Sequence, residues 1–95
     1  MPSALADLKI LDFSRVLAGP FATMMLADLG ASVTKIEPPN GDETRQWGPP
    51  YDELGDATYF QAVNRNKRSL VLDLTAPVDL ERARRLARET DVLVA

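Results

Sequence analysis

Short apolar runs alternate with amphipathic segments along this chain of 95 residues. The runs have the length and β-branched content of strands, whereas the segments between them repeat their apolar residues at helical spacing. The predicted strands are residues 8–13, 32–36, 69–74 and 91–95. The predicted helices are residues 19–29, 58–64 and 77–89. Strands that alternate with helices indicate an α/β fold, a Rossmann-like parallel sheet with flanking helices.

The first predicted helix has sharp boundaries and a wide apolar face. Pro20 suits the first turn of a helix, where its missing N–H has no partner to lose, and Gly30 suits the position after the last turn. The apolar face is formed by Phe21, Met24, Met25, Leu26 and Leu29.

A long irregular segment, residues 38–57, separates the second predicted strand from the second helix. Two Pro-Pro pairs and three glycines exclude a regular helix or a central strand there. Loops of this length in a compact domain are often functional. Trp47 and Tyr51 in this segment either pack on a neighbouring element or take part in function, and both interpretations are kept.

The composition excludes several kinds of chemistry. The chain contains no Cys and no His, which removes thiol nucleophiles, imidazole bases and most metal sites, so we expect no metal. The net charge of −3 argues against nucleic acid as a partner. The first residues lack the features of a signal peptide, and no apolar run approaches the roughly 20 residues that span a bilayer. We therefore expect a soluble, cytoplasmic protein without a membrane partner.

Three loops are expected to meet at the carboxyl edge of the sheet, where open parallel sheets bind their ligands. They are residues 14–20, the segment that begins at Glu37, and residues 74–77. The first loop contains Ala18, Gly19 and Pro20 but lacks the glycine spacing of a dinucleotide fingerprint, so NAD is disfavoured. The chain also lacks the P-loop pattern of nucleotide triphosphatases.

Four charged residues near the strand ends each allow two interpretations. For Asp12, at the end of the first strand, hydrogen bonding to the adjacent turn is favoured over a role in chemistry. Glu37 closes the second strand and either contacts a ribose or anchors the following loop. Lys67 and Arg68 precede the third strand, opposite the ligand edge, and surface or subunit contacts are favoured over ligand phosphates.

Two separated motifs resemble the N-terminus of a known family. The stretch LDFSRVLAGPFATMMLADLGASVTKIEPPNGDETRQWGPP holds A-G-P at residues 18–20, and YFQAVNRNKRSLVLDL holds N-x-N-K-R-S at residues 64–69. Together they resemble a family III CoA-transferase, the CaiB/BaiF group that includes formyl-CoA transferase, carnitine CoA-transferase and α-methylacyl-CoA racemase. The resemblance covers essentially the whole chain.

The resemblance implies that residues 1–95 are the incomplete N-terminal CoA-binding segment of a longer protein whose subunits interlock as a homodimer. Its substrates would be an acyl-CoA and a carboxylic acid, with no permanently bound cofactor. An Asp of the transferases attacks the acyl-CoA carbonyl and forms a mixed anhydride, which is covalent catalysis by a carboxylate. That Asp lies beyond position 95, so no catalytic residue is assigned here.

The resemblance also implies the residues that bind CoA. The residues along the cofactor would be Val16, Leu17 and Ala18. The residues that hold its adenine end through backbone groups would be Leu72, Asp73, Leu74 and Thr75. Many family members carry basic residues at positions 38 and 75 for the CoA phosphates, whereas this chain has Pro38 and Thr75. That task would then fall to Arg15 or to a residue outside the chain.

The leading hypothesis is therefore a CoA-transferase that moves CoA between carboxylic acids, present as an N-terminal fragment. Alternatives are a 2-methylacyl-CoA racemase and a non-catalytic CoA-binding or partner-binding module. A generic nucleotide-binding α/β unit is disfavoured by the missing fingerprints. Because the nucleophile is expected outside the chain, residues 1–95 alone are expected to be inactive.

Overall fold

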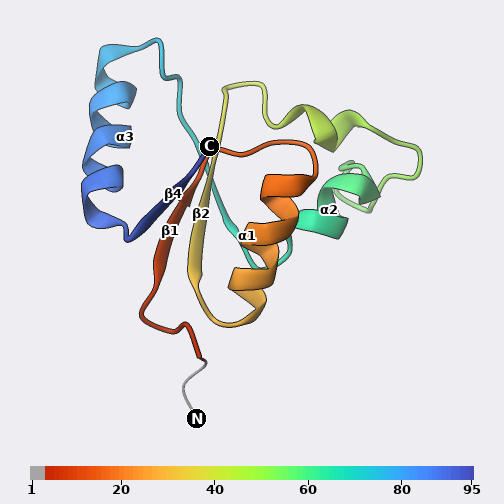
Figure 1. Cartoon of the computed structure of the whole chain (residues 1–95). Helices are drawn as coiled ribbons and strands as arrows, with labels where there is room; N and C mark the ends of the chain where they lie inside the picture. The colour runs from red at the N-terminus through yellow and green to blue at the C-terminus, as the bar shows by residue number, and fades with distance from the viewer. Residues whose placement is uncertain (1–3) are drawn as a thin grey trace.

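The computed structural model describes residues 4–95, which form a parallel four-stranded sheet between helices (Figure 1). The strands are β1 (Lys9–Asp12), β2 (Ser32–Glu37), β3 (Arg68–Val71) and β4 (Val92–Val94). The helices are α1 (Ala18–Asp28), α2 (Thr58–Asn64) and α3 (Pro77–Glu89), with a 3-10 turn, η1 (Glu43–Gln46). The strand order is β3-β2-β1-β4, and all pairs are parallel. The predicted α/β class is confirmed.

The third strand is shorter than predicted. Helices α2 and α3 begin and end where the sequence pattern placed them, but β3 ends at Val71 rather than at residue 74. The next amide, of Leu72, still donates to the carbonyl of Glu37 at 3.0 Å. Pro38 and Pro39 directly follow the end of the neighbouring strand β2, and because proline has no N–H the ladder stops there.

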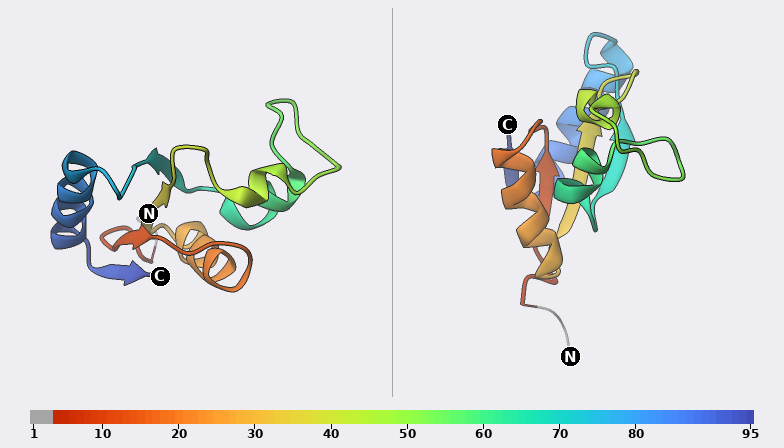
Figure 2. Two further views of the ribbon diagram at one scale, coloured as in Figure 1. Left: turned by 90° about the horizontal axis from the view of Figure 1, so that it is seen from above. Right: turned by 90° about the vertical axis from the view of Figure 1, so that its right-hand side faces the viewer.

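The helices lie in two layers, one on each face of the sheet. Helices α1 and α2 cover one face, and α3 covers the other (Figure 2). Ile10 and Leu11, adjacent in β1, point to opposite faces, as alternation along a strand requires. Ile10 packs with Ala27, Ala31 and Val33 in one core, and Leu11 packs with Ile36, Leu72 and Ala83 in the other.

Helix α1 packs on the sheet through a narrower face than its sequence indicates. Met24 is buried together with the small side chains of Thr23 and Ala27. Phe21, Met25 and Leu29, which belong to the predicted apolar face, are each about half exposed. The small residues let the helix approach the strands, and the large ones therefore point away from the sheet.

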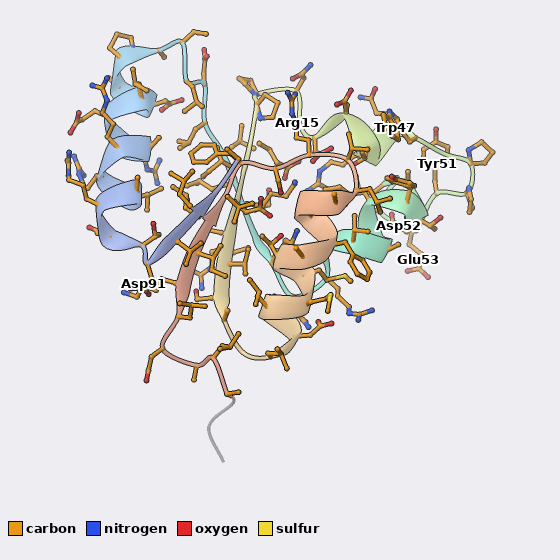
Figure 3. The ribbon with its side chains drawn as sticks, in the orientation of Figure 1. Arg15, Trp47, Tyr51, Asp52, Glu53 and Asp91 are labelled. Carbon is orange, nitrogen blue, oxygen red and sulfur yellow. The ribbon has the colours of Figure 1, made fainter. Side chains whose placement is uncertain are left out.

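The long loop projects from the sheet beyond α2 (Figures 1 and 3). Its Trp47 packs against Tyr59 of α2 with ring centroids 5.4 Å apart, and the Tyr51 hydroxyl donates to the carbonyl of Gln46 at 3.2 Å. Both aromatic side chains are about half exposed. The packing interpretation is thus supported for Trp47.

The helices in residues 4–95 are all too short or too polar to cross a bilayer. The longest, α3, has 13 residues, and its outer surface carries several exposed arginines.

Substituting Leu11→Ala should destabilise the fold by about 3 kcal/mol, because truncation of a fully buried leucine removes apolar contacts and leaves a cavity. Leu54→Ala is the matched control, because Leu54 is 86% exposed and its truncation should cost less than about 0.5 kcal/mol. Urea unfolding gives both values. Equal effects of the two substitutions would contradict the assigned core.

Candidate ligand site

An open pocket of about 500 Å³ lies at the carboxyl edge of the sheet. Its walls are Phe13 and Arg15 after β1, residues 36–39 at the end of β2, and residues 72–75 after β3. Apolar side chains dominate these walls. Open parallel sheets bind ligands at this edge, so the topology and the pocket identify the same place.

Residues 72–75 follow β3 and all line the pocket. The Asp73 carboxylate accepts hydrogen bonds from the Thr75 amide at 3.0 Å and from the Thr75 hydroxyl at 2.5 Å. The Asp73 amide donates to Oδ2 of Asp79 at 2.8 Å. Within the described chain, the Leu74 amide is the one N–H of this segment without an intramolecular partner. Leu74 is therefore where a ligand could accept a backbone hydrogen bond.

Val16, Leu17 and Ala18 lie outside the pocket: Val16 and Leu17 are on the loop that leads into α1, and Ala18 is the first residue of that helix. Val16 has a φ of 75°, a left-handed conformation that a β-branched residue seldom adopts and that costs about 1–3 kcal/mol. At the same turn a Cβ on Gly19 would overlap the side chain of Ser14, so only glycine fits there. The loop is therefore held in a tight, strained shape.

Asp12 lies under this loop and is completely buried. It accepts hydrogen bonds from the Ser14 amide at 2.8 Å, from the Ser14 hydroxyl, and from the Thr23 hydroxyl at 2.6 Å. Burial alone would raise the pKa of Asp12, but these bonds and the nearby Lys67 outweigh it, and the pKa lies below its ordinary value. The turn-bonding interpretation of Asp12 is confirmed.

The ammonium group of Lys67 is also buried beneath the loop. Its Nζ lies 3.1 Å from Oδ2 of Asp12 and donates to the Pro20 carbonyl at 3.0 Å and to Oδ1 of Asn64 at 2.9 Å. The prediction of surface contacts is therefore wrong for Lys67, although Arg68 beside it is exposed. No local pattern indicates this pairing, because Lys67 and Asp12 are 55 positions apart in the sequence.

Glu37 anchors the loop after β2. Its two carboxylate oxygens accept from Nε and Nη2 of Arg45 at 2.7 and 2.8 Å, and they also accept from the Asp42 amide and the Ser69 hydroxyl. Burial would raise the pKa of Glu37, but the bonds from Arg45 and Ser69 lower it to about 2. Of the two interpretations of Glu37, this geometry supports the loop anchor rather than the ribose contact.

Lys35, in the middle of β2, joins the two loops and was not identified from the sequence. Its buried Nζ donates to the Ser14 carbonyl at 2.8 Å and lies 2.9 Å from Oδ2 of Asp42. Its position in the centre of a predicted strand is the signal that could have identified it. A lysine is almost never fully buried unless it is paired, so a lysine there indicates a partner of opposite charge.

Arg15 is the positively charged residue among those that line the pocket, and its side chain is labelled in Figure 3. Its side chain is exposed, and it forms no ion pair with another residue of the described chain. The charge of Glu37, which also lines the pocket, is already neutralised by Arg45. Asp73, which also lines the pocket, forms no ion pair with a residue of the described chain. The pocket therefore combines apolar walls with one cation, Arg15, that is available to an anion, and one carboxylate, Asp73, that accepts hydrogen bonds from Thr75.

The fold and the pocket define a Rossmann-like α/β protein with a ligand site at the sheet edge. The sequence model described as "CoA-transferase family III" matches residues 5–95. The chain belongs to this family.

Relatives and solved structures agree with this assignment. The chain is 48% identical over 96 residues to a protein of Agrobacterium fabrum named succinate–glutarate CoA-transferase, covering 95% of this chain and 24% of that protein. It is 50% identical over 91 residues to a human protein named succinyl-CoA:glutarate CoA-transferase, covering 95% of this chain and 20% of the relative. A CaiB/BaiF family protein from Brucella suis superposes with a TM-score of 0.92 at 46% identity, over 98% of this chain and 25% of that one. The chain thus spans about a quarter of the length of these proteins.

Substituting Glu37→Gln should remove a pH-dependent contribution to stability. A folded-state pKa of about 2 against an ordinary 4.5 corresponds to about 3 kcal/mol above pH 4.5, which is lost progressively as the pH falls from 4.5 to 2. The free energy of unfolding of the wild type should therefore fall more steeply than that of the variant in this range. Denaturant unfolding at pH 6, 4 and 3 measures the difference, and parallel pH profiles would contradict the assigned role.

Proposed function

We propose that the protein containing this chain transfers CoA between carboxylic acids, and that residues 4–95 form one wall of its acyl-CoA site. The observation that carries the proposal is the pocket at the carboxyl edge of the sheet, with its apolar walls and the unpaired Arg15, in a chain of CoA-transferase family III. Relatives whose names are CoA-transferases support it further.

The chemistry of the pocket suits the adenine end of CoA. Phe13, Ile36 and Leu72 offer apolar contact to a planar ring, and the free Leu74 amide offers it a hydrogen-bond donor. We assign residues 72–75 to this end. Val16, Leu17 and Ala18 would meet the remainder of the cofactor where it leaves the pocket across the loop toward α1.

The chain contributes binding rather than the nucleophile in this proposal. Asp12, Glu37 and Asp42 are buried, and each accepts hydrogen bonds from its own fold. A carboxylate that attacks a thioester must reach the carbonyl carbon with a free oxygen. In line with the family resemblance, we place the nucleophile outside residues 4–95 and assign no catalytic residue in this chain.

Acyl-CoA is then a substrate, and no resident cofactor is needed. We further propose that the protein acts as a cytoplasmic homodimer without a nucleic-acid or membrane partner. The family resemblance and the net charge of −3 support this part of the proposal.

The activity is tested on the full-length protein. We expect incubation with succinyl-CoA and a second dicarboxylate, such as glutarate, mesaconate or oxalate, to yield the new CoA thioester and free succinate, which chromatography resolves. A panel of acids is needed, because the relatives' names contain several different ones.

Two other outcomes separate the alternatives. Exchange of the α-proton of a 2-methylacyl-CoA for deuterium in D2O, with no transfer to any acid, would favour the racemase. Binding of CoA without either reaction would favour the non-catalytic module. Absence of CoA binding would overturn all three functions.

Substituting Arg15→Ala should weaken CoA binding by about tenfold, because the pocket loses the positive charge that faces the ligand phosphates. Arg15→Lys should retain most of the affinity, and Arg84→Ala on the exposed surface of α3 is the matched control for lost net charge. Calorimetry at low and at high salt measures the effect, which should shrink as salt rises. Unchanged affinity of Arg15→Ala would reject Arg15 as a phosphate contact.

A further inference from the structure

The N-x-N-K-R-S motif supports the loops of the pocket without lining it. Ser69 donates its hydroxyl to Glu37, which anchors the loop after β2. Lys67 reaches Asp12, which anchors the loop after β1. Arg65 and Asn66 instead bond to Asp28 at the exposed end of α1. Two members of the motif therefore act on the two loops that border the ligand site.

Lys67 is the junction between three elements. It leads into β3, while Asn64 at the end of α2 accepts one of its hydrogen bonds. Pro20 in the first turn of α1 accepts another, and Asp12 at the end of β1 completes the set. All three contacts are 3.1 Å or shorter, and the Lys67 side chain is only 2% exposed. The three hydrogens of the ammonium group thus match three acceptors.

The loop between β1 and α1 depends on this junction for its shape. Val16 holds a left-handed backbone conformation that persists only when the surrounding structure enforces it. Asp12 binds the loop at Ser14, before Val16, and Lys67 holds the Pro20 carbonyl after it. The ion pair between Asp12 and Lys67 therefore fixes both ends of the strained segment relative to one another.

We propose that Lys67 is a positioning residue for acyl-CoA binding, acting through Asp12 and the Pro20 carbonyl on residues 13–20. This rests on the proposed function, in which Val16, Leu17 and Ala18 meet the cofactor. Without Lys67 the buried carboxylate of Asp12 loses its counter-charge. The Pro20 carbonyl loses its link to β1, and the Thr23 hydroxyl remains as the contact of α1 with Asp12. The loop then leaves the conformation that presents Val16, Leu17 and Ala18 to the ligand.

The test compares Lys67→Met with Arg65→Met in the full-length protein. Both substitutions remove one positive charge of the motif and one ion pair, but the Arg65 pair with Asp28 is on the surface. We expect Lys67→Met to raise the Kd for CoA and the KM for acyl-CoA by tenfold or more, while the KM for the acid acceptor stays within twofold. Arg65→Met should leave all three constants within twofold.

Amide hydrogen exchange of the ligand-free protein gives a readout that does not depend on CoA. The amides of Ser14 and Phe21, which donate to Asp12 and to the Leu17 carbonyl, should exchange at least tenfold faster in Lys67→Met, with the amides of α3 unchanged. A purely structural role would instead accelerate exchange throughout the fold and shift both KM values together. Either that pattern or wild-type exchange and CoA affinity in a folded Lys67→Met protein would overturn the inference.

A double variant keeps the test decisive if Lys67→Met does not fold. Asp12→Asn with Lys67→Met leaves no unpaired buried charge, and the asparagine can still accept from Ser14. We expect this protein to fold and still to bind CoA at least tenfold more weakly than the wild type, whereas wild-type affinity would overturn the inference. Failure of the wild type itself to bind CoA would reject the proposed function, and the exchange comparison would then still decide whether Lys67 positions the loop.

Discussion

Charges buried at one edge of the sheet must find partners of opposite sign, and the architecture of the site follows from this constraint. Asp12, Lys35, Glu37, Asp42 and Lys67 have almost no exposed side-chain surface. An isolated charge in such a place costs far more than a fold of this size can offset. Each of the five is therefore paired, and every pairing joins segments that are distant in the sequence or separated by a turn.

These pairings make one platform out of loops that would otherwise be independent. Lys67 ties the start of α1 to β1, Lys35 ties the Ser14 carbonyl to Asp42, and Arg45 ties Glu37 to Asp56. Buried ion pairs contribute little net stability compared with apolar replacements, but removing one partner is costly. In this structure the ion pairs define the positions of the loops: they hold a strained loop beside a pocket whose walls are mostly apolar.

The buried acids Asp12 and Glu37 hold the neighbouring loops in place, which is the structural one of the two interpretations that the sequence allowed for each. Asp12 and Glu37 lie at strand ends where a catalytic or ribose-binding acid is plausible, yet both accept several hydrogen bonds from residues of the loops and helices around them. A carboxylate at the carboxyl edge of a parallel sheet is thus insufficient evidence for chemistry. Arg15, which forms no ion pair in the described chain, is the cation of the pocket wall that remains for an anionic ligand.

Local pattern predicted the regular elements well and the packing of side chains less well. The boundaries of α2 and α3 follow from apolar spacing and from Pro77, all of which act within one or two turns. The same spacing predicted too wide an apolar packing face for α1. Thr23 and Ala27 lie against the sheet, whereas Phe21 and Met25 are about half exposed. Periodicity reports which residues share a face but not how closely that face can approach its neighbour.

The sequence by itself determined the α/β class and the edge of the sheet where the pocket lies. Its two motifs also determined the resemblance to CoA-transferase family III. Residues 72–75, which line the pocket, were implied by this family resemblance. Only the tertiary structure decided the partners of Lys35 and Lys67 and the place of Val16 outside the pocket. Helices and strands depend on neighbours along the chain, whereas the partner of a buried charge depends on strand order and on the stagger between strands. No pattern in a single sequence encodes that stagger, because it emerges when the two faces of the sheet are packed.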